Sequence, residues 1–308
     1  MKPQITVGIC VKNAQRTIGE TIESVLTQNY RRDLIEIIVV DGNSSDATLS
    51  IVSKILSKTS IRWRLYSDGG KGLGYARQTV VNQAHGRYVV FVDSDAIIRN
   101  DFLRRQIEFM NANPRVGVGL GRYMYQEGNW ISSTWNLYHY TMQDFVGCAF
   151  IFRRDAVRSV RGFDEQIKGA GEDVDLIARM QSKGWLSAMN ERAEFFHNYR
   201  ATMKDFWLEH SWFGYGGYYL ALKNRRLFSP SWNLPPGKLV HGLRTASKAY
   251  RTTGRKISFL ILPLLLFGNL AWWSGFLNAV THRYGREGKS THTQSRKSMP
   301  SNCESSSL

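Results

Sequence analysis

The sequence predicts an α/β fold in which a mainly parallel central sheet is flanked by helices. Apolar, strand-like runs alternate with helix-like segments over residues 5–92, and this alternation implies right-handed βαβ crossovers. The run from Tyr88 to Val92 has no polar alternation, which is typical of a strand buried on both faces. Acids or a glycine-rich turn follow three of these runs, and the carboxyl ends of parallel strands are where ligands bind.

The individual elements follow from the spacing of apolar residues. Strands are expected at residues 5–11, 34–40, 61–66 and 88–92, and helices at residues 18–27, 46–57 and 75–84. Ser45 or Asp46 is the expected N-cap of the second helix. A later helix should begin within residues 169–179, with Leu176 and Met180 on its buried side.

Three strand ends carry polar chemistry. The second strand ends at Asp41, the third is followed by the glycine-rich residues 68–74, and the fourth ends at Asp93, Ser94 and Asp95. Two carboxylates at a strand end are hard oxygen ligands for a divalent cation. Asp and Ser are also common turn residues, so a simple strand-end turn is the alternative. Neither a dinucleotide-binding G-x-G-x-x-G nor a P-loop spacing is present.

Composition divides the chain into two parts. Of a net charge of +16, residues 201–308 contribute 15 Lys/Arg against 4 Asp/Glu (+11), which leaves +5 for residues 1–200. This asymmetry predicts an anionic partner for the last third, either membrane lipid or nucleic acid. Three scattered cysteines predict neither a disulfide framework nor a zinc site, and the N-terminal residues read as a strand and not as a signal peptide.

The last third has the composition of a membrane-associated region. Residues 204–228 combine aromatic side chains with cations, as interfacial segments do, although a helix packed on the main domain is the alternative. Residues 257–280 have no formal charge and would span about 36 Å as a helix, against roughly 30 Å of hydrocarbon. Pro263 and Gly268-Asn269 interrupt this segment, so a single span and a re-entrant hairpin both remain open. Residues 281–308 are expected to be a disordered tail.

Several motifs resemble one known family. They are Val7-Gly-Ile-Cys-Val-Lys-Asn, Glu36 to Asp46, Phe91-Val-Asp-Ser-Asp95, Gly162-Phe-Asp-Glu165 and Gly171-Glu-Asp-Val-Asp-Leu176. In this order and spacing they resemble the family 2 glycosyltransferases, which have the GT-A fold. The resemblance covers about residues 5–200. It departs at Asp41-Gly42, where the family often has Asp-Asp, and at Ala76-Arg77-Gln78, where it often has Ala-Arg-Asn.

The resemblance implies a domain organisation. Residues 1–200 would be the GT-A catalytic domain, residues 201–256 a basic, aromatic interfacial region of helices, and residues 257–280 a hydrophobic membrane segment before the tail. It also implies a nucleotide-sugar co-substrate and a divalent metal, Mg²⁺ or Mn²⁺. Asp95 would be the direct metal ligand, and Asp93 would contact the ribose or the waters of the metal. His197 would be a further ligand or a diphosphate contact, although a lone His is often structural.

The remaining donor-site residues follow from the same resemblance. Asp41 would accept a hydrogen bond from the nucleobase, which fits uracil or a guanine edge, with helix capping as the alternative. Val11 and Lys12 would complete that pocket, and Ser94 lies between the paired acids. Lys71 and Arg77 are the nearest cations to the diphosphate by position in the sequence, although either could be a solvated charge.

The acceptor side is implied to lie at Glu172 and Asp173. Asp173 matches the general base of the family, which takes the proton of the acceptor hydroxyl during an inverting transfer, and Glu172 would position the acceptor or compete for the role of base. The alternative is a helix N-terminus at which acids are favoured by the macrodipole.

Together these residues predict a metal-dependent inverting glycosyltransferase at the membrane, with its catalytic domain on the cytoplasmic side. A UDP- or GDP-linked donor would supply the sugar to a lipid-linked or nascent-glycan acceptor. A polyprenyl- or dolichyl-phosphate glycosyltransferase is the alternative enzyme. From another class, a basic protein that binds nucleic acid or lipid without catalysis has no recognised motif, and no nucleic-acid partner is expected.

Overall fold

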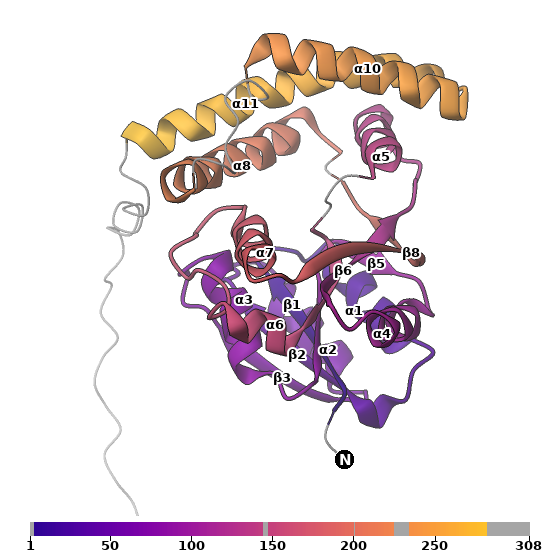
Figure 1. The fold of residues 1–308 in the computed structure, drawn as a ribbon, viewed down its shortest axis with the longest axis vertical. Helices are drawn as coiled ribbons and strands as arrows, with labels where there is room; N and C mark the ends of the chain where they lie inside the picture. The colour runs from indigo at the N-terminus through magenta and orange to yellow at the C-terminus, as the bar shows by residue number, and fades with distance from the viewer. Residues whose placement is uncertain (1–2, 144–146, 200, 225–233, 282–308) are drawn as a thin grey trace, which may run out of the picture.

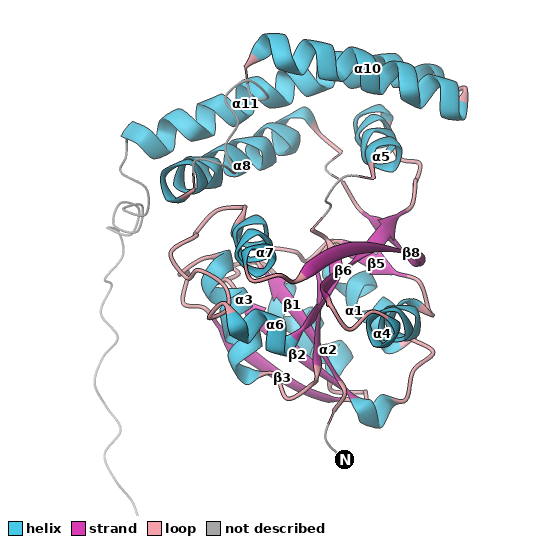
Figure 2. Cartoon of the chain, in the orientation of Figure 1, coloured by secondary structure: helices cyan, strands magenta, loops and turns pink. Residues whose placement is uncertain are grey.

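The computed structural model describes residues 3–143, 147–199, 201–224 and 234–281. Eight strands form one sheet (Figure 2): β1 (Ile5–Val11), β2 (Ile35–Asp41), β3 (Arg62–Ser67), β4 (Tyr88–Val92), β5 (Ala96–Ile98), β6 (Val116–Tyr123), β7 (Ala149–Arg153) and β8 (Leu186–His197). The helices of the α/β part are α1 (Ile18–Leu26), α2 (Thr48–Leu56), α3 (Leu73–Gln83), α4 (Phe102–Ala112), α5 (Trp130–Met142), α6 (Arg154–Ser159) and α7 (Glu172–Ser182), with a short 3₁₀ turn η1 (Arg32–Leu34).

The sheet order is β3-β2-β1-β4-β7-β6-β8-β5. The first four strands in this order are parallel, as predicted, and β8 also runs parallel to β6. Strand β7 is antiparallel to both β4 and β6, and β5 is antiparallel to β8. The predicted strands and helices before residue 92 lie within one or two residues of the observed ones.

Burial on both faces of the sheet explains the continuous apolar runs. Along β2, Ile37 and Val39 belong to a core cluster shared with α1 and α2, whereas Ile38 and Val40 belong to a second cluster shared with α3 and α7. Successive strand side chains point to opposite faces, so a strand covered by helices on both sides must be apolar at every position. The strand ends, which carry the polar residues, are therefore positioned by two cores at once.

A separate layer of helices covers one side of the α/β part (Figure 1). It consists of α8 (Met203–Lys223), α10 (Pro235–Thr253), the 3₁₀ turn η3 (Lys256–Leu260) and α11 (Ile261–Thr281). A third core cluster joins this layer to α5 through Trp135, Phe206 and Leu264. The segment Lys256–Thr281 is long and apolar enough to cross a membrane by length and composition, and 39% of its most apolar window is buried against the protein.

The interruptions predicted within residues 257–280 are not observed. Helix α11 runs without a break from Ile261 to Thr281. Pro263 lies in its first turn, where the missing N–H is tolerated. Gly268 lies within the continuous helix and permits a close contact. A Cβ there would lie 2.8 Å from the ring of His210 on α8. The predicted tail after residue 281 lies outside the described residues. Arg225 and Arg226 also lie outside them.

Candidate active site

The residues predicted to bind the nucleotide lie together at the carboxyl edge of the first strands. Val11 and Asp41 are register partners at the ends of β1 and β2, and both are buried. The carboxylate of Asp41 accepts hydrogen bonds from the backbone N–H of Ser44 at 3.1 and 3.3 Å. Lys12 is exposed beside Gly42, whose added Cβ would lie 3.2 Å from the Cβ of Lys12. The predicted pocket residues are therefore adjacent.

The glycine-rich turn is organised by an acid that the sequence analysis did not assign to the site. Asp68 is buried, and its carboxylate accepts from the backbone N–H groups of Gly70 (2.6 Å) and Gly72 (3.2 Å). Gly72 has a φ of +107°, and a Cβ there would lie 2.8 Å from the Cα of Lys168. The turn therefore packs closely against the segment before α7. Lys71 is exposed, and its ammonium lies 4.0 Å from the centre of the Tyr75 ring.

Arg77 is the centre of the site. It lies on α3, its side chain is 3% exposed, and the rings of Phe91 and Phe150 flank its guanidinium at 5.5 and 5.1 Å. It forms an ion pair with Asp93 at 2.8 Å and another with Glu172, and an oxygen of Asp173 lies 3.8 Å away. Arg77 therefore joins the predicted donor acid to the two predicted acceptor-side acids. It is not a solvated charge.

The acids at the start of α7 have perturbed acidity. Burial raises the pKa of Glu172, while the charge of Arg77 opposes this shift and that of Asp173 adds to it. Burial also raises the pKa of Asp173, whose side chain is 14% exposed. One oxygen of Asp173 accepts the backbone N–H of Val174 at 2.7 Å. A carboxylate with a raised pKa is a stronger base, and perturbed acids of this kind cluster at functional sites.

Asp95 and His197 form a second pair beside this cluster. Asp95 lies just before β5 and His197 ends β8, and the pairing of Ala96 with His197 brings the two side chains together. Oδ1 of Asp95 lies 3.0 Å from Nε2 of His197, and both residues are buried. Although burial alone would lower it, contact with Asp95 raises the pKa of His197. Cys148 adjoins the pair, and burial raises the pKa of its thiol to about 11.

This pair fits a divalent cation that also binds a substrate. Among the described residues, no three His, Cys, Asp or Glu side chains form a metal-binding group. Asp95 would offer a carboxylate oxygen and His197 an imidazole nitrogen, and divalent cations accept both kinds of ligand. Mg²⁺ is commonly held by one or two protein ligands together with phosphates, so a two-ligand set suffices. Asp93 is turned toward Arg77, and Ser94 is half-buried between the acids.

A second polar cluster joins α8 to α7 and to the segment before it. Nζ of Lys223 lies 2.5 Å from Asp164 and 2.8 Å from Asp175, and the hydroxyl of Tyr219 donates to Gln166 at 2.8 Å. Sequence analysis did not link these residues to the site. The sequence signals for this cluster were the positions of Asp164 in the motif Gly162–Glu165 and of Asp175 in the motif that begins at Gly171.

The aromatic residues of α5 mostly serve packing. Trp135 and Tyr138 on α5 are buried, and their rings stack 4.7 Å apart. Trp135 also contacts Phe206 and His210 of α8. These rings join α5 to the helical layer, while Trp130 is 50% exposed.

Comparisons with known sequences identify two matching family profiles. The profile described as glycosyl transferase family 2 matches residues 6–161, and that described as glycosyl transferase family group 2 matches residues 88–282. An uncharacterized glycosyltransferase of Haemophilus influenzae is 34% identical over 131 residues, which are 42% of this chain and 51% of that protein. The chain thus spans about half the length of this relative.

Two further comparisons concern a named activity and the fold. The Escherichia coli UDP-Glc:alpha-D-GlcNAc-diphosphoundecaprenol beta-1,3-glucosyltransferase WfaP is 36% identical over 106 residues, 34% of this chain and 41% of that protein. The mannosyltransferase PcManGT of Pyrobaculum calidifontis, solved in complex with GDP-Man and Mn²⁺, superposes with a TM-score of 0.63. It is 19% identical, over 92% of this chain and 88% of that one, and this likeness confirms the GT-A type of fold.

Proposed function

Because the chain belongs to glycosyl transferase family 2, we propose that it transfers a sugar from a nucleotide-sugar donor to a hydroxyl of a lipid-linked or glycan acceptor at a membrane. The observation that carries the proposal is the convergence on Arg77. One buried guanidinium contacts Asp93 at the end of β4 and both acids at the start of α7. A donor site and an acceptor site would then share one fixed centre.

On the donor side, Asp41 would accept a hydrogen bond from the base, with the backbone at Val11 and Lys12 lining the pocket. An imide N–H of uracil and the edge of guanine both suit a carboxylate acceptor. Asp95 and His197 would hold Mg²⁺ or Mn²⁺, which when bound compensates the negative charge that grows on the departing diphosphate. Lys71 adds a positive charge at the glycine-rich turn.

On the acceptor side, Asp173 would take the proton of the attacking hydroxyl. The oxygen of that hydroxyl forms the new bond to the anomeric carbon while the bond to the diphosphate breaks on the opposite face, so the configuration inverts. The raised pKa of Asp173 supports this role, because it makes the carboxylate a better proton acceptor. Glu172, which is held in place by its ion pair with Arg77, would position the acceptor.

The lipid-linked class of acceptor is supported by the position of the helical layer. Residues 169–171, directly before Glu172, contact α8: a Cβ on Gly216 would lie 2.0 Å from the carbonyl oxygen of Ala170. The E. coli relative is named for an acceptor on diphosphoundecaprenol. A cytoplasmic orientation of the catalytic domain remains a prediction. A polyprenyl-phosphate acceptor is the second candidate, since an acceptor that is already anionic has little need of Asp173.

Thermal-shift titration with UDP-, GDP- and dTDP-sugars, with and without Mn²⁺, tests the donor site. We expect one nucleotide class to raise the melting temperature, and EDTA to reduce that shift. Asp95→Asn should abolish the metal-dependent part, whereas Asp155→Asn, on the exposed start of α6, should leave it intact. If no nucleotide stabilises the protein, the proposed donor site is wrong.

A further inference from the structure

Helix α10 carries an apolar stripe on the side that faces away from the protein. Its inner side is buried through Thr245, Ala246 and Ala249. Leu239, Leu243 and Tyr250 follow at helical spacing on the outer side, with 44%, 54% and 42% of their surfaces exposed. The ring of Tyr250 lies 5.2 Å from that of Phe259 in η3, which is itself 60% exposed, so the stripe continues beyond the helix.

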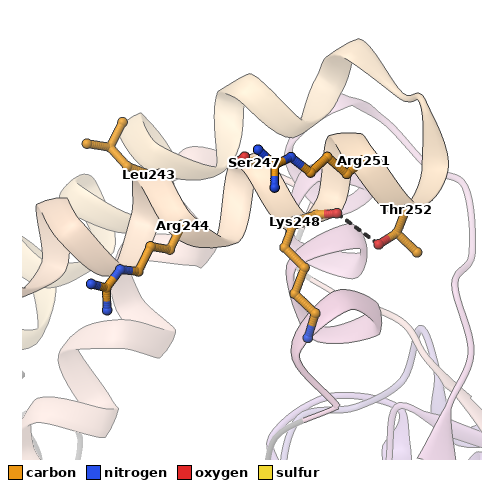
Figure 3. A pocket seen from close by; sticks show the side chains of 6 residues that line it. All are labelled: Leu243, Arg244, Ser247, Lys248, Arg251 and Thr252. Carbon is orange, nitrogen blue, oxygen red and sulfur yellow. Dashed lines mark hydrogen bonds between the residues drawn. The ribbon is translucent and has the colours of Figure 1, made fainter.

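A second stripe, of cations, lies on another side of the same helix. Arg244, Lys248 and Arg251 are spaced four and three residues apart and are exposed. With Leu243, Ser247 and Thr252 they line a shallow hollow of about 460 Å³ (Figure 3), in which Leu243 points to a different side from Arg244 and Lys248. Within the described ranges none of the three cations is ion-paired. Residues 235–260 contain six Lys/Arg and no Asp or Glu, and one of the six, Arg255, forms an ion pair with Glu127.

The packing of α11 determines how this surface can meet a membrane. A Cβ at Gly275 of α11 would lie 1.8 Å from the carbonyl oxygen of Ser211, and one at Gly214 of α8 would lie 1.8 Å from that of Trp272. The two helix backbones are therefore in contact. The opposite side of α8 contacts residues 169–171 of the catalytic domain, so α8 lies between that domain and α11 (Figure 1).

This arrangement disfavours a bilayer crossing by α11. A crossing would carry α8 into hydrocarbon with Lys204, Asp205 and Glu209, and an ionised side chain at the bilayer centre costs about 3 kcal/mol or more. A helix that lies in the plane of the interface avoids that cost. Leu270 and Leu277, on the free side of α11, are 61% and 56% exposed and are available to such an interface.

We propose that α10, η3 and α11 form a platform that lies flat on an anionic phospholipid bilayer, with Arg244, Lys248 and Arg251 on lipid phosphates. The apolar stripe enters the boundary between headgroups and acyl chains. Nucleic acid would satisfy the cations but would leave the adjacent leucines and Phe259 in water. A second copy of a chain with net charge +16 would be repelled. This inference rests on the proposed function at a membrane and names the surface of the protein that would contact the lipid.

Flotation of the full chain with lipid vesicles tests the platform. We expect tight binding to vesicles of equal phosphatidylcholine and phosphatidylglycerol, weak binding to phosphatidylcholine alone, and release in concentrated KCl. Each cation near an anionic surface contributes about fivefold, so combined Arg244→Ala, Lys248→Ala and Arg251→Ala should weaken binding about a hundredfold. Leu243→Ser should weaken binding to both kinds of vesicle, because the contribution of its side chain does not depend on lipid charge.

A matched control removes the same charge elsewhere. Arg32→Ala, Lys54→Ala and Lys58→Ala lie on the exposed α1–α2 side of the catalytic domain, away from α10 (Figure 1), and should leave binding almost unchanged. If the control variant loses as much vesicle binding as the triple variant, the platform is overturned. The same holds if the protein stays on the vesicles in concentrated KCl and the triple variant binds them as tightly as the unchanged protein. If the triple variant loses binding to DNA but keeps its binding to vesicles, the platform is also overturned. Vesicle binding needs no donor, so failure here leaves the proposed glycosyl transfer standing.

Discussion

The catalytic domain and the helical layer use charge in opposite ways. In the catalytic domain Arg77 and Glu172 are 3% and 2% exposed and paired, so their charges set the relative positions of side chains inside the protein. On α10 the cations Arg244, Lys248 and Arg251 lie outside. Buried charge must be compensated internally, whereas exposed charge can address a partner. This contrast fits the two proposals, in which the α/β part carries out a reaction and the helical layer binds a membrane surface.

The two parts also pack differently. Side chains from both sheet faces fill the cores of the catalytic domain. Helices α8 and α11 instead meet backbone to backbone at Gly214 and Gly275. Small residues permit this approach, which is common where helices associate in or at membranes. Four substitutions test whether the distinction holds, and they follow from the largest expected effect to the smallest.

Asp173→Asn should lower the rate of transfer by about 10²–10⁴-fold, because the amide cannot accept the proton of the acceptor hydroxyl. Initial rates with the donor identified by thermal shift measure this loss, and donor affinity should be retained. Asp155→Asn removes an acid from the first turn of another helix and should leave the rate unchanged. Nearly full activity of Asp173→Asn would favour a polyprenyl-phosphate acceptor.

Arg77→Met should reduce the free energy of unfolding by about 3–5 kcal/mol, because it leaves Asp93 and Glu172 without their buried counter-charge. Urea denaturation measures the change. Arg99→Met breaks a pair with Glu194 in which the Arg99 side chain is 52% exposed, and it should cost no more than about 1 kcal/mol. Equal losses in the two variants would contradict the central role given to Arg77.

Gly214→Ala should destabilise the contact between α8 and α11 by about 1–3 kcal/mol, since the new methyl group collides with backbone. Limited proteolysis near the helical layer, together with thermal melting, would detect it. Gly19→Ala in α1 is the matched control. Its added Cβ has no neighbour closer than 3.8 Å, and it should stabilise the helix by about 0.5–1 kcal/mol.

Thr202→Ala should have the smallest effect, about 1 kcal/mol. The hydroxyl of Thr202 accepts the backbone N–H of Asp205 at 3.1 Å and so caps α8. Thermal melting of the whole chain measures the change. If the melting of the catalytic domain does not move while the helical layer becomes sensitive to protease, the two parts are only weakly coupled.

The strands and their polar ends were predictable because the signal is local. The run before Asp93 is apolar at every position, and burial on both faces requires that pattern. The partners of Arg77 were not predictable, because apolar periodicity reports which side of a helix is buried and not which element covers it. His197 was placed with Asp95 only by the resemblance. The apolar pattern does not bring the two together, because their contact depends on the pairing of β5 with β8.

The helical layer was the least predictable part. The composition of residues 257–280 indicated a membrane segment, but Pro263 and Gly268 suggested an interruption that α11 does not have. The role of Gly268 depends on His210, which lies on a different helix. Similarly, the burial of Trp135 and Tyr138 depends on residues of α8 and α10, which are distant in the sequence.

The place of β5 in the sheet has a consequence for biosynthesis. Strand β5 is the last in the sheet order and pairs with β8 alone. During synthesis, the first four parallel strands and the base-side residues Val11 and Asp41 can assemble while the ribosome is still translating the later strands. Asp95 can contact His197 only after residue 197 has been synthesised. The nascent chain can therefore build the proposed nucleotide pocket early. It completes the proposed metal site only after β8 has emerged, immediately before the helices of the layer.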